Sequence, residues 1–102
     1  MRLRHLIIAS TFMVASTIPS TAFADMVESN ANRPGNDIRG LDARDSDACR
    51  DACIAERRCL AWTYVNPGIQ AQSGRCWLKD KVPNRVTDRC CTSGTKFERI
   101  DP

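Results

Sequence analysis

The chain has 102 residues with six cysteines and one histidine, and its formal net charge is +3. This length allows one domain at most and excludes a multi-step enzyme with a buried cofactor cavity. Without Arg2 and Arg4, which belong to an N-terminal leader, the net charge falls to +1, too low for a nucleic-acid-binding protein that works through a basic surface.

Residues 1–24 have the composition of a secretory signal peptide. Arg2 and Arg4 precede an apolar run, Leu6–Ala15, and an Ala-Phe-Ala sequence at 22–24 is typical of a cleavage site. The alternative is a membrane anchor, which needs about 20 apolar residues, but serine and threonine interrupt this run. We therefore expect cleavage before Asp25 and export to the periplasm or the extracellular medium, where cysteines are oxidised.

The mature chain begins with polar, aperiodic residues, and we expect a flexible lead-in over 25–31 before a domain spanning 32–98. The Arg-Pro-Gly-Asn-Asp sequence at 33–37 is typical of a turn, because proline presets φ and glycine tolerates positive φ. Ile38–Leu41 follows as a candidate for a short strand.

A helix is predicted from about Asp47 to Arg57. An Asp-Ser-Asp sequence at 45–47 supplies oxygens for an N-cap, and Arg57 and Arg58 place positive charge at the other end. Cys49 and Cys53 are four residues apart and therefore share one face, together with alanines. Side chains this small allow the helix to lie close to a sheet.

Three strands are predicted after the helix, at Cys59–Val65, Arg75–Lys79 and Thr92–Phe97. A polar loop over 66–74 and a connection that includes 82–85 join them. One helix against a small, mostly antiparallel sheet is an α+β fold.

The cysteines predict disulfide cross-links, because a small exported domain with few large aliphatic side chains lacks a sufficient core. Six cysteines allow fifteen pairings, and spacing does not choose among them. A Cys53–Cys59 bridge would close about seven residues and a Cys49–Cys76 bridge about 28. The chain-entropy model equates these loops with roughly 2.4 and 3.6 kcal/mol.

The last two cysteines, Cys90 and Cys91, are adjacent. If the other four are paired, these two can bond each other, bond another chain or stay reduced. Zinc or redox chemistry would favour C-x-x-C pairs, but the first pair here is C-x-x-x-C and the one histidine lies in the leader. We therefore expect disulfides, with no metal and no cofactor.

Strand alternation gives a candidate binding surface. If Cys59 and Cys76 face the helix, Ala61, Thr63 and Leu78 face it as well. The large side chains on the opposite face would be Leu60, Trp62, Tyr64 and Trp77. These aromatics would form either a recognition platform or a second small core covered by the 66–74 loop and the 82–91 connection. Three arginines would rim this surface or simply be solvated: Arg57, Arg58 and Arg75.

Catalytic groups are scarce in the mature chain. Without a histidine after Asp25, this chain alone cannot build a Ser-His-Asp or Cys-His site. Four carboxylates cluster around the helix start, at Asp42, Asp45, Asp47 and Asp51. A calcium site or an acid/base pair is one interpretation, but EF-hand spacing is missing and we expect capping and solvation. No catalytic residue is predicted.

Several segments together resemble the PAN/Apple domain family in its short bacterial form. They are Asn-Arg-Pro-Gly-Asn-Asp-Ile at 32–38, Cys-x-x-x-Cys at 49–53, Cys-Leu-Ala-Trp-Thr-Tyr at 59–64, Cys-Trp-Leu-Lys at 76–79 and Cys-Thr-Ser-Gly at 91–94. The resemblance covers roughly Asn32 to Phe97, most of the mature chain.

This resemblance implies a curved antiparallel sheet crossed by one helix, with bridges from the helix to the central strands. Its residue-by-residue implication is a Cys49–Cys76 and a Cys53–Cys59 disulfide. Longer Apple domains also join their termini, but this chain has no cysteine before Cys49, and the roles of the last two cysteines stay open.

Family members act as adhesion modules. We therefore expect an exported, non-catalytic module that binds a protein or a carbohydrate, with no nucleic-acid partner and no membrane anchor after cleavage. The alternative is a small secreted inhibitor or effector of a partner enzyme, which would act through the 66–74 loop. An enzyme would need groups from a partner chain.

Overall fold

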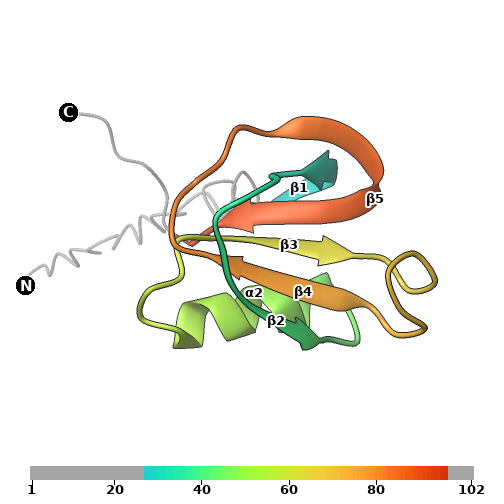
Figure 1. Cartoon of the computed structure of the whole chain (residues 1–102), viewed down its shortest axis with the longest axis horizontal. Coiled ribbons are helices and arrows are strands. Elements are labelled where there is room, and N and C mark those ends of the chain that lie inside the picture. The colour runs from blue at the N-terminus through green and yellow to red at the C-terminus, as the bar shows by residue number, and fades with distance from the viewer. Residues whose placement is uncertain (1–26, 97–102) are drawn as a thin grey trace, which may run out of the picture.

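The computed structural model describes residues 27–96 (Figure 1). Their elements, in chain order, are β1 (Val27–Asn32), β2 (Asp37–Asp42), α2 (Ser46–Ala55), β3 (Ala61–Val65), β4 (Arg75–Lys79) and β5 (Val86–Thr95). The predicted signal peptide and its cleavage site lie outside the described residues, as does Phe97.

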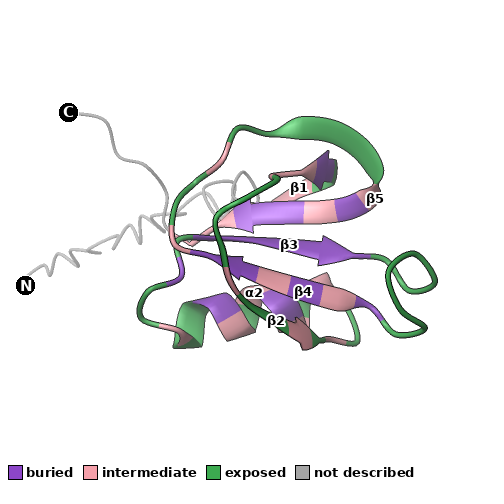
Figure 2. Ribbon diagram, viewed as in Figure 1, coloured by how far each residue is buried: buried purple, intermediate pink, exposed green. Residues whose placement is uncertain are grey.

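The five strands form one sheet in the order β1-β5-β3-β4-β2, and each neighbouring pair is antiparallel. The helix α2 crosses one face of this sheet and contacts β3 and β4 most (Figure 1). β3 lies in the middle, and all five of its residues are buried (Figure 2). The predicted α+β architecture, one helix on an antiparallel sheet, is confirmed.

The helix begins where its capping chemistry indicates. Asp45 is the N-cap, and its carboxylate accepts a hydrogen bond from the backbone N–H of Ala48 at 2.8 Å. The helix ends at Ala55, since Glu56 is extended and its N–H closes the last turn. The prediction of a helix that continues to Arg57 was therefore two residues too long.

Two segments predicted to lack regular structure are strands. The flexible lead-in expected over 25–31 is wrong for residues 27–31, which belong to β1 (Val27–Asn32) and pair with β5. The last strand, expected to begin at Thr92, begins at Val86. Both errors have one cause: these segments receive their backbone hydrogen bonds from each other, across more than 50 residues, and local composition does not encode such a partner.

The core lies between α2 and the sheet. Trp62, Tyr64 and Leu78 pack there against the cysteines of the helix. The prediction that Trp62 and Tyr64 face away from the helix is therefore wrong. That prediction counted strand alternation from Cys59, but β3 begins only at Ala61, and the irregular backbone before it changes which residues face the helix.

Two disulfides cross this core, Cys49–Cys76 and Cys53–Cys59. All four sulfur-bearing residues are fully buried. The pairing is the one that the family resemblance implied, and it ties α2 to β4 and to the segment before β3. The third disulfide joins the neighbours Cys90 and Cys91 within β5, one of the outcomes that the spacing left open.

Candidate functional site

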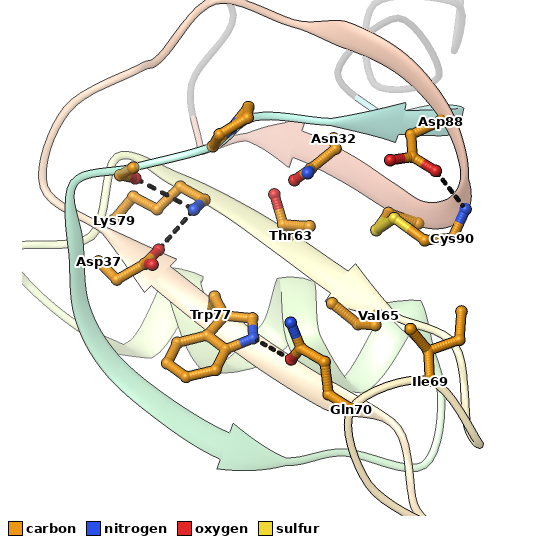
Figure 3. Close-up of a pocket in the computed structure, with 13 residues that line it drawn as sticks. Asn32, Asp37, Thr63, Val65, Ile69, Gln70, Trp77, Lys79, Asp88 and Cys90 are labelled. Carbon is orange, nitrogen blue, oxygen red and sulfur yellow. Dashed lines mark hydrogen bonds and ion pairs between the residues drawn. A yellow bond between two sulfur atoms is a disulfide. The ribbon is translucent and has the colours of Figure 1, made fainter.

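A pocket of about 430 Å³ lies on the face of the sheet opposite α2, which we call the open face (Figure 3). Its floor is formed by Thr63 and Val65 of β3, which alternate with the core residues Trp62 and Tyr64. All five strands and the 66–74 loop contribute side chains to it. Residues that are distant in sequence therefore meet in one hollow.

Trp77 is the aromatic side chain of this pocket, and three contacts fix its ring. Its Nε1 donates a hydrogen bond to the side-chain oxygen of Gln70 at 2.8 Å. The ring packs on Gly40 of β2, where an added Cβ would lie 2.6 Å from a ring carbon. The Arg75 guanidinium lies 5.4 Å from the ring centroid, within the range of a cation–π contact. The indole is half-buried and is held in place without a ligand.

An ion pair stands at one end of the pocket. The Lys79 residue is only 2% exposed, and its Nζ donates to the Asp37 carboxylate and to the backbone oxygen of Gly35. An ammonium has three N–H groups, and these two acceptors satisfy two of them. The pair presents a donor next to an acceptor, and its two charges cancel.

The pocket floor is held by a chain of hydrogen bonds. The Arg33 N–H donates to Thr63 Oγ1 at 3.4 Å, and Ser93 Oγ donates to the backbone oxygen of Ala31 at 2.9 Å. Since Ser93 has only one hydroxyl hydrogen, the 2.7 Å contact between the two hydroxyls is donated by Thr63. Every hydroxyl in this network has a partner for its hydrogen, so the network fixes the floor of the pocket.

The opposite side of the pocket is a bulge in β5. The β1–β5 register places residues 88–91 opposite the single residue Asn30, which has a φ of 54°. Asp88 accepts a hydrogen bond from the Cys90 N–H at 3.0 Å, and the Cys90 carbonyl accepts one from the Asn66 N–H at 2.9 Å. Asp88, Cys90 and Cys91 all line the pocket.

The structure divides the predicted binding residues. Trp77 lies in the pocket, and Arg75 lies beside it, where its 2.7 Å hydrogen bond holds the pKa of Asp42 below the ordinary value. Arg57 and Arg58 are exposed in the turn after α2 and do not line the pocket. Trp62 and Tyr64 are core residues, so the platform of three aromatics that the sequence suggested does not exist.

Tyr64 illustrates the difference between core and pocket. Its hydroxyl donates to the backbone oxygen of Arg44 at 3.1 Å. Burial raises the pKa of Tyr64 above its ordinary value, and the nearby Asp45 carboxylate adds to the rise. A tyrosine held in this way supports the fold and is not offered to a ligand.

The polar half of the pocket was not predicted from the sequence; it consists of Asn32, Asp37, Gln70, Lys79 and Asp88. Lys79 could have been found, because it lies two residues after Trp77 on the same strand and therefore on the same face. The others come from β1, β2, the loop and the β5 bulge, and only the strand order brings them together.

Three disulfides within residues 27–96 are typical of an extracellular domain. In the same part of the chain, no helix has the length and hydropathy needed to cross a bilayer.

A family model for the PAN domain matches residues 31–79. A comparison with curated proteins found no match. The matched residues run from the end of β1 through β4, and they contain α2 and both disulfides of the core. Residues 88–91, with the Cys90–Cys91 disulfide, lie beyond the match. The family match, the helix-on-sheet architecture and the core disulfides agree that residues 31–79 carry a PAN domain.

Proposed function

We propose that this chain is an exported, non-catalytic binding module that recognises a carbohydrate with the pocket on the open face of its sheet. PAN domains are commonly protein- or carbohydrate-binding modules, which supports a binding role. The leader-like composition of residues 1–24 and the three disulfides support export.

The pocket composition carries the choice of a carbohydrate. A fixed indole, Trp77, lines the same pocket as side chains that donate and accept hydrogen bonds, such as Asn32 and Asp88. A sugar ring needs this combination, because its C–H faces are apolar and its hydroxyls both donate and accept. The Lys79–Asp37 pair offers an adjacent donor and acceptor of the kind that neighbouring hydroxyls require.

The volume and the net charge of the pocket also favour a glycan as the ligand. A volume of about 430 Å³ lies in the range of small-molecule pockets, so it suits one end of a glycan better than a protein surface. Charged groups in the lining are Lys79, Asp37 and Asp88, which leave one net negative charge and do not favour an acidic sugar. A neutral glycan is therefore the proposed ligand.

The test is a glycan array probed with the secreted, disulfide-intact protein, followed by titration of the best glycan. We expect binding to a group of related neutral glycans, and a loss of about tenfold or more in affinity for Trp77→Ala. Leu60→Ala is the matched control, because Leu60 is 39% exposed but does not line the pocket. Absence of glycan binding, or equal affinity of Trp77→Ala and wild type, would contradict the proposal.

A second candidate function is inhibition of a partner enzyme through the 66–74 loop. One observation favours it: residues 66–73 are all exposed, and Ile69 within them is 56% exposed. Exposed apolar side chains at a loop are typical of protein contacts. This function predicts that a hydrolase co-purified from the native milieu is inhibited, and that Ile69→Asp relieves the inhibition.

A further inference from the structure

The Cys90–Cys91 disulfide differs in kind from the other two. Cys49–Cys76 spans 27 residues and Cys53–Cys59 spans six, and each joins different segments. Cys90–Cys91 joins neighbours within β5 and closes the smallest loop that a disulfide can close. Constraint of the unfolded chain grows with loop length, so this bridge contributes least to global stability. Its presence needs another explanation.

The position of the Cys90–Cys91 disulfide supplies an explanation for its presence. Both cysteines line the pocket, and Cys90 is half-buried, so part of it faces the hollow. Figure 3 shows Cys90 and Asp88 on the side of the pocket across β3 from Trp77. Val65, on the floor of the pocket, lies between Cys90 and Trp77 (Figure 3). Carbon and sulfur atoms thus form an apolar strip next to the polar groups of Asp88 and Asn32.

The bridge also defines the shape of this side. A bond between adjacent side chains closes a small ring that includes their peptide group, and it removes rotamer freedom from both residues. The bulge backbone has its own supports, because Asn66 donates to the carbonyls of Cys90 and Arg89 at 2.9 and 3.2 Å. Those bonds do not depend on sulfur. The ring is therefore a rigid surface mounted on a bulge that is held independently.

We propose that the Cys90–Cys91 disulfide is a wall of the binding pocket that packs against the C–H face of a pyranose ring. Asp88 and Asn32 bind the hydroxyls at the edge of that ring. This inference rests on the proposed carbohydrate-binding function, and it adds a ligand contact that lies outside the part of the chain matched by the PAN domain model.

The first test compares wild type with the double variant Cys90→Ser/Cys91→Ser, using the best neutral glycan from the array. The variant should melt within about 5 °C of wild type, and its affinity for the glycan should fall about tenfold or more. Unchanged affinity in the folded variant would overturn the proposal. The control is Val86→Ser, which changes an exposed β5 residue outside the pocket and should bind normally.

The second test needs no variant. Tris(2-carboxyethyl)phosphine reduces the bridge to two thiols, while water supplies one oxygen to the phosphine and two protons to the sulfurs. Alkylation and mass spectrometry then measure the rate at Cys90 and Cys91. A saturating concentration of the array glycan should slow this reduction about fivefold or more, whereas a glycan that the array shows not to bind should leave it unchanged. Equal rates with both glycans would overturn the proposal.

The two proposals fail differently. If wild type binds no glycan on the array, both are wrong. If wild type binds, Trp77→Ala does not, and neither the double variant nor the protection experiment shows an effect, the pocket function stands and the disulfide wall is wrong.

Discussion

The two faces of the sheet consist of alternating residues of the same strands, but different interactions hold them together. The helix face is closed, and two disulfides and the buried Trp62 and Tyr64 fill it. Within residues 27–96 no helix covers the open face, which is organised by hydrogen bonds, the Lys79–Asp37 ion pair and a local disulfide. Successive side chains of a strand point to opposite faces. Two neighbouring residues of one strand can therefore serve different roles, one in the stability of the core and the other in the proposed binding pocket.

The largest effect should come from removing a bridge of the closed face. In Cys49→Ala/Cys76→Ala the unfolded chain regains the freedom of a long loop, a loss of roughly 3.6 kcal/mol, and the buried sulfurs leave a cavity. A domain of this size has about 5 kcal/mol to lose. We expect little secreted protein and no cooperative melt by circular dichroism. A cooperative melt close to that of wild type would show that the open face alone can hold the fold.

The two tryptophans test the comparison directly. Trp62 is 1% exposed on the closed face, so Trp62→Ala should cost about 3–5 kcal/mol in the free energy of unfolding. Trp77 is half-buried on the open face, and Trp77→Ala should cost about 1 kcal/mol or less while removing glycan binding. Urea denaturation measures both variants. Similar losses of stability would mean that the two faces are equally structural.

Substitutions at two glycines, one on each face, should have smaller effects than those at the tryptophans. A Cβ at Gly74 would lie 2.0 Å from the hydroxyl of Tyr64 on the closed face, and a Cβ at Gly40 would lie 2.6 Å from the ring of Trp77 on the open face. Gly74→Ala should therefore destabilise the protein by about 1–3 kcal/mol through overpacking. Gly40→Ala should displace the indole and weaken glycan binding, with a smaller loss of stability. Thermal melts and glycan titrations separate the two outcomes.

The smallest effect concerns Tyr64, the one tyrosine of the chain. Its pKa is raised above 10.0 in the folded protein, mainly by burial. Below pH 10 the hydroxyl is protonated in both the folded and the unfolded state, so it does not make the free energy of unfolding depend on pH. Above that pH the unfolded chain ionises first, so stability should decline as the pH rises toward the folded-state pKa. Tyrosinate ultraviolet absorbance measures the midpoint, and a midpoint at the ordinary value would show that the hydroxyl is not buried.

Local chemistry made some elements easy to predict. β4 was predicted with the bounds that the structure has, and α2 was predicted within two residues at its C-terminal end. The N-cap of Asp45 and the polar loop of 66–74 are signals contained in a few adjacent residues. β1 carries no such signal, because its hydrogen bonds come from β5 at the far end of the domain.

The amino-acid sequence by itself determined the α+β class, the position of the helix, the dependence on disulfides and the resemblance to the PAN domain family. The first three follow from composition, capping residues and cysteine content, and the resemblance follows from short sequence blocks such as those at 59–64 and 76–79; all of these signals are local. Only the tertiary structure decided which face each aromatic occupies and which residues form the pocket. The facing of Trp62 depends on where β3 begins, and the pocket depends on a strand order that brings Asp37, Lys79 and Asp88 to one face. Both are set by pairing between distant strands, which alternation within a single strand cannot specify.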